Sequence, residues 1–308
     1  MAFPTASRAA GEPAAAAIRI ARPEAAWFAS DMHLDDSEPA LAGRFLRLLD
    51  DTLTAMRAGS ERPCLFLLGD IFEYWVGDDH LPDVAQSLAR RLIDFTRAGG
   101  RAFLMHGNRD FLMDAPLVAQ STARSPDHPP AIPFSVRCGA LLLPDPTVIE
   151  VAGRRIALSH GDGLCTDDTR YQQWRLLCRS SVWQQQFLAR PVAERLAMAQ
   201  RMRHQSMQAQ AATETVSDVN PTAVDALMTQ SAADLLIHGH THQPMLHRWR
   251  REGSAAAADM GETWRLRWVL SDWAAEPPRG EILPITEASC PLAPAETPAG
   301  AQGRAPRD

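Results

Sequence analysis

The chain has 308 residues, of which 45% are hydrophobic, and its formal net charge is -6 at pH 7. A chain of this length can bury one large core, alone or with a sizeable insertion. The acidic balance argues against a general nucleic-acid binder, since such proteins carry a strong basic excess. The five cysteines include no Cys-x-x-Cys pair, so a disulfide framework and a zinc ribbon are both disfavoured and a reducing compartment is expected. No run of about 18 apolar residues occurs, so no segment is apolar for long enough to span a bilayer.

Composition divides the chain into a central domain and two flanking segments. Residues 1–24 are rich in alanine but interrupted by charges, so they lack the apolar core of a signal peptide. They offer little to pack, and we expect a disordered leader. Residues 276–308 are dominated by proline and alanine and are expected to form a disordered tail. One catalytic domain is therefore expected at residues 25–275.

The first half of that domain alternates predicted strands and helices. A strand ends at Ser30, and an amphipathic helix follows from Pro39, with apolar residues spaced at i, i+4, i+7 and i+8. A second strand covers residues 64–68. A second helix closes at Gly99-Gly100 and leads into a strand at 102–105. Two successive strand–helix–strand units predict a right-handed, mainly parallel sheet.

The second half of the domain begins with short extended segments and a hairpin turn at 151–154, followed by a strand at 156–159. Residues 171–210 have a helical pattern, and we interpret them as an inserted helical lid. A short helix then leads to a strand that ends at His238, and residues 265–270 are predicted to form a late strand.

Five of the predicted strands stop at residues that can bind metals. The sequences at these ends are Asp31-Met32-His33, Gly69-Asp70, His106-Gly107-Asn108-Arg109-Asp110, His160-Gly161-Asp162 and His238-Gly239-His240. Binding groups gather at the carboxyl ends of parallel strands, so residues distant in sequence are expected to meet there. The candidate ligands are Asp31, His33, Asp70, Asn108, His160, His238 and His240.

Seven oxygen and nitrogen donors are too many for one ion and suit two. Donors of this mixed type without thiolate favour Mn²⁺, Fe²⁺ or Zn²⁺, and ligand type alone does not choose among the three. One carboxylate must bridge if the ions lie ~3.5–4 Å apart, as in two-metal hydrolases. Such a pair activates water and neutralises charge that builds on phosphorus, so the sequence indicates hydrolysis of a phosphate ester or anhydride.

The order Asp-x-His, Gly-Asp, Gly-Asn-Arg-Asp, Ser-His-Gly-Asp and Gly-His-x-His resembles the calcineurin-like metallophosphoesterases. The resemblance implies an α/β fold, a four-layered α/β/β/α sandwich, and two Mn²⁺ ions. It implies that Asp70 bridges the two ions. The other ligands implied are Asp31, His33 and His240 for one ion and Asn108, His160 and His238 for the other.

Further matching blocks, among them Phe72-Glu73 and Leu164–Asp168, resemble one branch of this family. That branch cleaves the pyrophosphate of a diacylated sugar nucleotide and is peripheral on the cytoplasmic face of the inner membrane. The resemblance therefore implies a lipid-linked sugar nucleotide and the membrane surface as partners, and no nucleic acid. It implies catalytic roles for Asp70, Asn108 and Arg109. It also implies substrate contacts by Asn108, Arg109, Asp168, Ser206 and His238.

Two features bear on the substrate: one is a departure from the family pattern, and the other is independent of the resemblance. Arg109 stands where many relatives have a histidine, and a guanidinium cannot act as a general acid near neutrality, so we expect it to clamp phosphate oxygens. The lid combines apolar residues with seven arginines and a single acid between residues 169 and 213. Such a segment suits acyl chains and anionic headgroups.

Three other classes of protein remain as alternatives. An enzyme on the same sandwich could act on a soluble phosphodiester or nucleotide, although the apolar, basic lid disfavours it. A metallo-β-lactamase-like hydrolase would need a His-x-His-x-Asp-His run, but Gln243-Pro244 follows His242. A scaffold that has lost its metals is disfavoured because all seven donors are present. We interpret His242, His106 and His80 as supporting or exposed groups, and we expect Asp78, Asp79, Asp110 and Asp162 to orient histidines.

Overall fold

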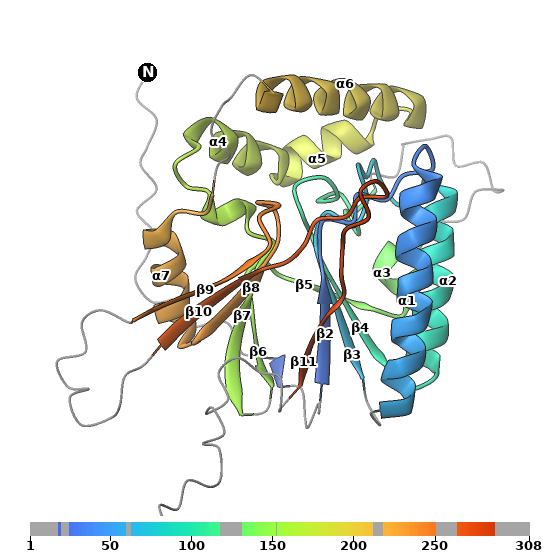
Figure 1. The fold of residues 1–308 in the computed structure, drawn as a ribbon. Coiled ribbons are helices and arrows are strands. Elements are labelled where there is room, and N and C mark those ends of the chain that lie inside the picture. Colours follow the sequence, from blue (N-terminus) through green and yellow to red (C-terminus); the bar gives the residue numbers. More distant parts are fainter. Residues whose placement is uncertain are drawn as a thin grey trace, which may run out of the picture.

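The computed structural model describes residues 18–19, 25–59, 63–117, 131–151, 153–211, 218–250 and 264–286. Two sheets lie face to face with helices on their outer sides (Figure 1). The five-stranded sheet has the order β11 (Leu283–Thr286), β2 (Ala25–Ala29), β3 (Cys64–Leu68), β4 (Arg101–Met105) and β5 (Leu141–Leu143). The six-stranded sheet has the order β1 (Ile18–Arg19), β6 (Thr147–Val151), β7 (Arg154–Leu158), β8 (Leu235–His238), β10 (Trp264–Val269) and β9 (Met245–Arg250).

Parallel pairing places the functional strand ends at a common edge. Strands β2 to β5 are mutually parallel, and β7, β8 and β10 are parallel in the second sheet. Antiparallel pairs occur between β6 and β7, between β9 and β10, and between β11 and β2. The expected parallel character is therefore confirmed for the five strands whose ends carry the candidate ligands.

The core between the sheets is built around an aromatic ladder. Phe28, Phe66 and Phe103 stack across β2, β3 and β4, with ring centroids 5.0 and 4.5 Å apart. These rings are buried in one apolar cluster with Ile156 and Ile237 of the opposite sheet. Because buried aromatic pairs contribute beyond their area alone, the ladder fixes the register of the three strands that lead to the site.

Helices cover both outer faces, as Figure 1 shows. Helices α1 (Pro39–Gly59), α2 (Asp83–Arg97) and α3 (Phe134–Cys138) pack on the five-stranded sheet, and α7 (Pro221–Ser231) packs on the six-stranded sheet. The apolar residues that the sequence places at helical spacing face the core. Those buried there include Phe45 and Leu49 of α1 and Leu88 and Leu92 of α2. The predicted four-layered α/β/β/α sandwich is confirmed.

Three further helices lie across the end of the sandwich where the parallel strands finish (Figure 1). They are α4 (Thr169–Cys178), α5 (Ser181–Leu188) and α6 (Val192–Ala211), and a short 3-10 turn at Asp162–Leu164 precedes them. Asp168 and Ser180 cap α4 and α5 through their side chains. Among the described residues, no helix is both long and apolar enough to cross a membrane.

The predicted ends of the folded domain are wrong in two places. Leu283–Thr286 forms β11, although we expected a tail from residue 276. Leu283 and Ile285 are buried and Pro284 is exposed, and an edge strand tolerates proline because one side of its backbone needs no partner. Ile18–Arg19, in the expected leader, pairs with β6. The remaining residues of both flanking segments lie outside the described residues.

Candidate metal centre

The loops at the strand ends have an unusual backbone. Five non-glycine residues there have positive φ: Asp31 (55°), His33 (48°), Asp70 (48°), His240 (68°) and His242 (53°). Such conformations cost about 1–3 kcal/mol each and persist where the surroundings over-determine them, typically at functional sites. Two glycines allow the loops to approach closely, because a Cβ on Gly107 would overlap the Asp70 carboxylate and one on Gly239 would overlap that of Asp31. The chain is therefore strained and tightly packed at the residues expected to bind metal.

Asp31 is fully buried and accepts several hydrogen bonds. The Ser30 hydroxyl donates to it at 2.6 Å and the His240 backbone N–H donates at 2.9 Å. His242 Nε2 lies 3.5 Å from its other oxygen. Burial alone would raise the pKa of Asp31, but the hydrogen bond from His242 and the charge of His160 hold that pKa well below its usual value. Asp31 is therefore ionised at neutral pH.

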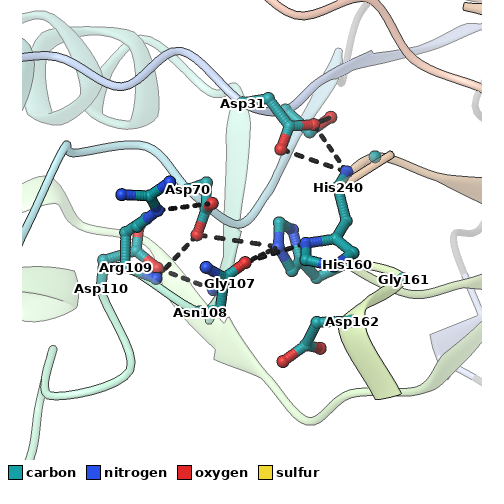
Figure 2. Close-up of polar contacts among 12 residues, drawn as sticks. Asp31, Asp70, Gly107, Asn108, Arg109, Asp110, His160, Gly161, Asp162 and His240 are labelled. Atoms are coloured by element: carbon teal, nitrogen blue, oxygen red, sulfur yellow. Dashed lines mark hydrogen bonds and ion pairs between the residues drawn. The ribbon is translucent and has the colours of Figure 1, made fainter. Parts of the chain in front are cut away.

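The Asp70 carboxylate lies between Arg109 and His160 (Figure 2) and also faces His33. Its Oδ1 accepts the Arg109 backbone N–H at 2.8 Å and lies 3.6 Å from His160 Nε2. Its Oδ2 lies 3.9 Å from His33 Nε2. One carboxylate therefore faces His160 with one oxygen and His33 with the other, as a bridging ligand requires.

Asn108 connects two of the histidines. Its Oδ1 lies 3.0 Å from His160 Nε2 and 2.9 Å from His240 Nδ1. His160 Nδ1 donates to the Leu68 carbonyl at 3.0 Å, which directs Nε2 at the amide oxygen. Burial would lower the pKa of His160, but the charges of Asp70 and Asp31 raise it to about 9. A proton, or a cation in its place, therefore bridges Nε2 and the amide oxygen. A carbonyl that fixes the tautomer of a ligating histidine is also typical of metal sites.

His242 and His238 do not occupy the positions that the sequence suggested. Asp31, His33 and His242 each offer a donor atom within 4.8 Å of the other two, and Asp31, Asp70 and His160 form a second such group. His238 is fully buried and donates from Nδ1 to the Gly239 carbonyl at 2.8 Å, while its Nε2 has no hydrogen-bond partner among the described residues. Burial and the charge of Arg267 lower the pKa of His238 to about 4. The geometry favours His242 over His238 as the partner of His240.

The sequence contained a signal for this outcome. The family motif is Gly-His-x-His, and its glycine corresponds to Gly239, so the second histidine is His242. Positive φ agrees, because it occurs at His240 and His242 and not at His238. The prediction of His242 as a supporting or exposed group overlooked that the motif begins at Gly239 and ends at His242.

Glu73 is a further member of the site that sequence reasoning did not single out. Its carboxylate lies 3.2 Å from His33 Nδ1 and 3.6 Å from an Arg109 nitrogen, and it forms an ion pair with Arg203 of α6. Burial would raise the pKa of Glu73, but His33, Arg109 and Arg203 together lower it to about 2. The carboxylate thus holds two guanidinium groups and one imidazole beside the cluster. Arg203 is 130 positions away in sequence, and no short motif contains both residues.

The four acids expected to orient histidines mostly have other partners. Asp110 accepts the backbone N–H groups of Gly107 and Ile71, both at 2.7 Å, so it joins the loops after β3 and β4. Asp78 accepts a hydrogen bond from Trp75 Nε1 at 2.8 Å, and Asp79 accepts one from Arg195 at 2.8 Å. Only Asp162 fits the expectation.

Asp162 reaches a histidine indirectly. It accepts from the Tyr171 hydroxyl at 2.7 Å and from Arg175 Nε at 2.8 Å. The Tyr171 ring stacks on His240 with centroids 6.1 Å apart. Asp162 therefore connects α4 to the metal centre.

The predicted substrate contacts are distributed unevenly. Asn108 and Arg109 lie at the cluster, as Figure 2 shows. Asp168 is occupied as the cap of α4, accepting the Tyr171 backbone N–H at 2.9 Å. Ser206 lies in α6, and its side chain is outside the described part of the structure.

A cavity of about 190 Å³ separates the cluster from the three covering helices. Its lining combines polar groups with aromatic and aliphatic groups. The polar group comprises Glu73, Asn108, Arg109 and Arg203, and the apolar group includes Trp75, Phe111, Leu112, Tyr171, Trp174, Trp183, Phe187, Ala199 and Met202. The cavity can therefore take a ligand with an anionic end and an apolar body.

The fold and this site define the class of protein. Residues 26–244 match the family described as calcineurin-like phosphoesterase, and the chain belongs to that family. The family uses divalent metals, and its members are enzymes that act on phosphoesters or anhydrides.

Relatives narrow the identification within the family. The chain is 42% identical over 265 residues to the UDP-2,3-diacylglucosamine hydrolase of Bordetella pertussis, an alignment that covers 84% of this chain and 90% of that one. It is 43% identical over 249 residues to the protein of the same name from Chromobacterium violaceum, with 80% and 89% covered. For Stenotrophomonas maltophilia the identity is 39% over 254 residues, with 80% and 90% covered. The chain is thus similar, over 80% or more of its length, to relatives that carry the name UDP-2,3-diacylglucosamine hydrolase.

Proposed function

We propose that this protein hydrolyses the pyrophosphate bond of UDP-2,3-diacylglucosamine, giving 2,3-diacylglucosamine 1-phosphate and UMP in lipid A biosynthesis. The observation that carries the proposal is the cavity that joins the donor cluster to an apolar pocket, in a chain 42% identical to a hydrolase of that name. The substrate has a pyrophosphate between its uridine and its glucosamine, and acyl chains on the glucosamine. The cavity offers Asn108 and Arg109 for the first and aromatic walls for the second.

The proposal includes two Mn²⁺ ions. Asp31, His33, Asp70 and His242 would hold one, and Asp70, Asn108, His160 and His240 would hold the other. The donor set fits, because Asp70 faces both His33 and His160 and because Asn108 Oδ1 and His160 Nε2 are directed at each other at 3.0 Å. When bound, such a pair activates water and stabilises charge on the phosphoryl oxygens. Imidazole and oxygen donors accommodate Mn²⁺, and the family resemblance favours it over Fe²⁺ and Zn²⁺.

The chain's own residues position the pyrophosphate. Arg109 has its backbone fixed by Asp70 and its side chain held near Glu73, so its guanidinium is preorganised to bind phosphate oxygens. The Asn108 amide adjoins the same position. Asp168 and Ser206 remain proposed contacts to the sugar nucleotide. His238 is fully buried, so we leave a substrate contact by it out of the proposal.

We place the enzyme at the cytoplasmic face of the inner membrane as a peripheral protein. The substrate carries two acyl chains, and the helical segment α4–α6 contributes apolar walls to the cavity, among them Trp183 and Phe187, whose rings stack 5.1 Å apart. A lipid of this kind resides in a bilayer, so the enzyme must meet it there. Nucleic acid has no part in the proposal.

Substrate competition tests the proposal. Purified protein with Mn²⁺ is offered the lipid nucleotide together with cyclic nucleotides and bis(p-nitrophenyl) phosphate, and UMP release is followed. We expect preferential cleavage of the lipid nucleotide, and loss of activity after exhaustive chelation that added Mn²⁺ restores. Preference for the small diesters would favour the alternative, a soluble phosphodiester or nucleotide. Full activity without metal would refute the metal-dependent mechanism.

A further inference from the structure

Asn108 is held through the two peptide groups that flank it. The following peptide is fixed within the sandwich, because its N–H, which belongs to Arg109, donates to Asp70 Oδ1 at 2.8 Å. The preceding peptide joins Gly107 to Asn108, and its carbonyl oxygen accepts a hydrogen bond from Arg179 Nη2 at 2.9 Å. Arg179 is the C-terminal cap of α4. One of the two peptides that orient a candidate metal ligand is therefore held by the covering helices.

The Gly107 carbonyl needs this partner because the other contacts of Gly107 do not orient it. The N–H of Gly107 donates to Asp110 Oδ1 at 2.7 Å, and a Cβ at this residue would overlap the Asp70 carboxylate. These contacts fix the place of the residue and the direction of its N–H. They leave ψ, the rotation that aims the carbonyl and the next peptide, to a residue without a side chain, the least restricted of all. The hydrogen bond from Arg179 restricts that rotation.

The orientation of this peptide matters because of what Asn108 contacts. Its Oδ1 lies 3.0 Å from His160 Nε2 and 2.9 Å from His240 Nδ1 (Figure 2). A rotation of the peptide between Gly107 and Asn108 would move this oxygen away from one ring or from both. Misplacement of a group at the reacting centre by about 1 Å can lower a rate by about 10²-fold. Arg109 would be less affected, because hydrogen bonds hold both its N–H and its carbonyl.

Arg175 of the same helix provides an internal comparison. Both guanidinium groups approach Asp162 Oδ2, that of Arg175 at 2.8 Å and that of Arg179 at 3.4 Å. Arg175 is therefore the stronger partner of Asp162, while the shorter contact of Arg179 is the one to the Gly107 carbonyl. The Arg179 guanidinium also lies 6.0 Å from the ring centre of Phe111, further along the same loop. The described residues that line the cavity do not include Arg179, so its route to the site is the backbone of the loop.

We propose that Arg179 is a positioning residue for hydrolysis. It holds the Gly107 carbonyl and thereby keeps the Asn108 amide oxygen directed at His160 and His240, where it can serve a bound metal ion. The donor belongs to α4, so the arrangement of Asn108 is complete only while α4 lies against the loop after β4. The inference rests on the proposed function, because turnover of the lipid nucleotide supplies one of its two readouts.

Steady-state kinetics of matched variants test the role of Arg179. Arg179→Met removes the donor but keeps an apolar side chain of similar length. Arg175→Met is the control, because it removes a partner of Asp162 and leaves the contact to Gly107 intact. We expect Arg179→Met to lower kcat about tenfold, as loss of a partner of a metal ligand typically does, and Arg175→Met to lower it about threefold or less. KM should stay within about twofold of wild type in both, because neither change removes a substrate contact. Arg179→Lys should recover part of the rate.

The Asp162→Asn background separates the carbonyl contact from the ion pair. If Arg179 acts through Gly107, adding Arg179→Met to Asp162→Asn should still lower kcat about tenfold. If the two substitutions together cost no more than Asp162→Asn alone, Arg179 acts only through Asp162 and the proposal is wrong. A wild-type kcat in Arg179→Met would overturn it equally. Circular dichroism verifies the fold, and if a methionine variant does not fold, Arg179→Lys against Arg175→Lys gives the same comparison with a smaller loss.

The side-chain amide resonance of Asn108 gives the second readout, which does not depend on activity. It is recorded by NMR on the full-length protein with diamagnetic Zn²⁺ in place of Mn²⁺. We expect the resonance to shift in Arg179→Met and to keep its wild-type position in Arg175→Met, and an unshifted resonance in both would contradict the proposal. If wild type does not cleave the lipid nucleotide, the proposed function falls, while the resonance still decides whether Arg179 places Asn108.

Discussion

The strand-end loops and the helical segment α4–α6 enclose the same cavity but are held in place by different means. The loops depend on strained backbone and on buried carboxylates that accept backbone N–H groups, as Asp31 and Asp110 do. The helices depend on guanidinium groups that reach into the sandwich. Arg175 and Arg179 pair with Asp162, Arg195 with Asp79 and Arg203 with Glu73.

The comparison changes the meaning of the arginine excess in the helical segment. Four of its seven arginines form ion pairs with acids of the sandwich, and a fifth, Arg190 between α5 and α6, pairs with Glu194 of α6. Most of the arginines behind the charge excess in the sequence therefore attach the covering helices to the sandwich. Few of them add positive charge to the surface. The loops define the chemistry, and the arginines define where the covering helices lie relative to it.

The largest effect is expected in the loops, at the shared carboxylate. Asp70→Ala removes the ligand that faces both His33 and His160. Metal pairs contribute several kcal/mol of transition-state stabilisation, so kcat should fall about a thousandfold or more. Steady-state UMP release measures the loss, and circular dichroism verifies the fold. A rate near wild type would refute the bridging role.

Arg109→Ala should have the next largest effect. Loss of one preorganised electrostatic group typically costs about 10²–10³ in rate, and kcat/KM should fall accordingly. Arg109 donates its backbone N–H to Asp70 at 2.8 Å and its Nε lies 3.8 Å from Asp70 Oδ2. It is not itself a candidate ligand, so metal content should remain at the wild-type level. Arg109→Lys is the matched control, and it should recover part of the rate because it restores charge without the bidentate fork. Metal loss in the alanine variant would contradict the assignment as a phosphate clamp.

A pair of histidine variants tests whether His242 or His238 binds metal in the loop after β8. His242→Ala removes a donor that lies with Asp31 and His33, and its metal affinity should fall about a hundredfold or more, beyond the range for outer-sphere partners. His238→Gln should keep the metal, because His238 is buried with its Nδ1 on the Gly239 carbonyl. Metal content by mass spectrometry after dialysis decides between them. The opposite ranking would restore the register predicted from sequence.

The sequence was sufficient for much of this architecture and for most of the donor set. Asp31, His33, Asp70, Asn108 and His160 could be assigned because each follows an apolar run and parallel strands finish at one edge. The choice of His238 over His242 missed the Gly-His-x-His motif that begins at Gly239, and the positive φ of His242 agrees with the motif. The pair of Glu73 and Arg203 joins segments far apart in sequence, and β11 was hidden in a segment whose composition resembles a tail.

Asp162→Asn probes the link between the loops and α4. The amide would keep the size of the carboxylate but lose its charge toward Arg175 and Arg179. Tyr171 would then be less firmly placed over His240. Partners of this outer kind typically contribute 10–100-fold, so we expect a loss of about tenfold in kcat/KM. Metal content should fall less than in His242→Ala, and an unchanged rate would make the link purely structural.

The smallest effect on catalysis, and a clear one on stability, should come from the fastening between α6 and the sandwich. Arg195 is 2% exposed in its side chain and Asp79 is 33% exposed. Asp79→Ala leaves the buried Arg195 guanidinium without its carboxylate partner, which should lower the free energy of unfolding by about 3 kcal/mol. Arg195→Met leaves Asp79 partly hydrated and fills the space with apolar atoms. The free energy of unfolding should therefore fall by less, about 1 kcal/mol. Urea denaturation measures both, and activity well below the transition should be retained. Equal destabilisation by the two variants would mean that packing of Arg195, and not its charge, fastens the helix.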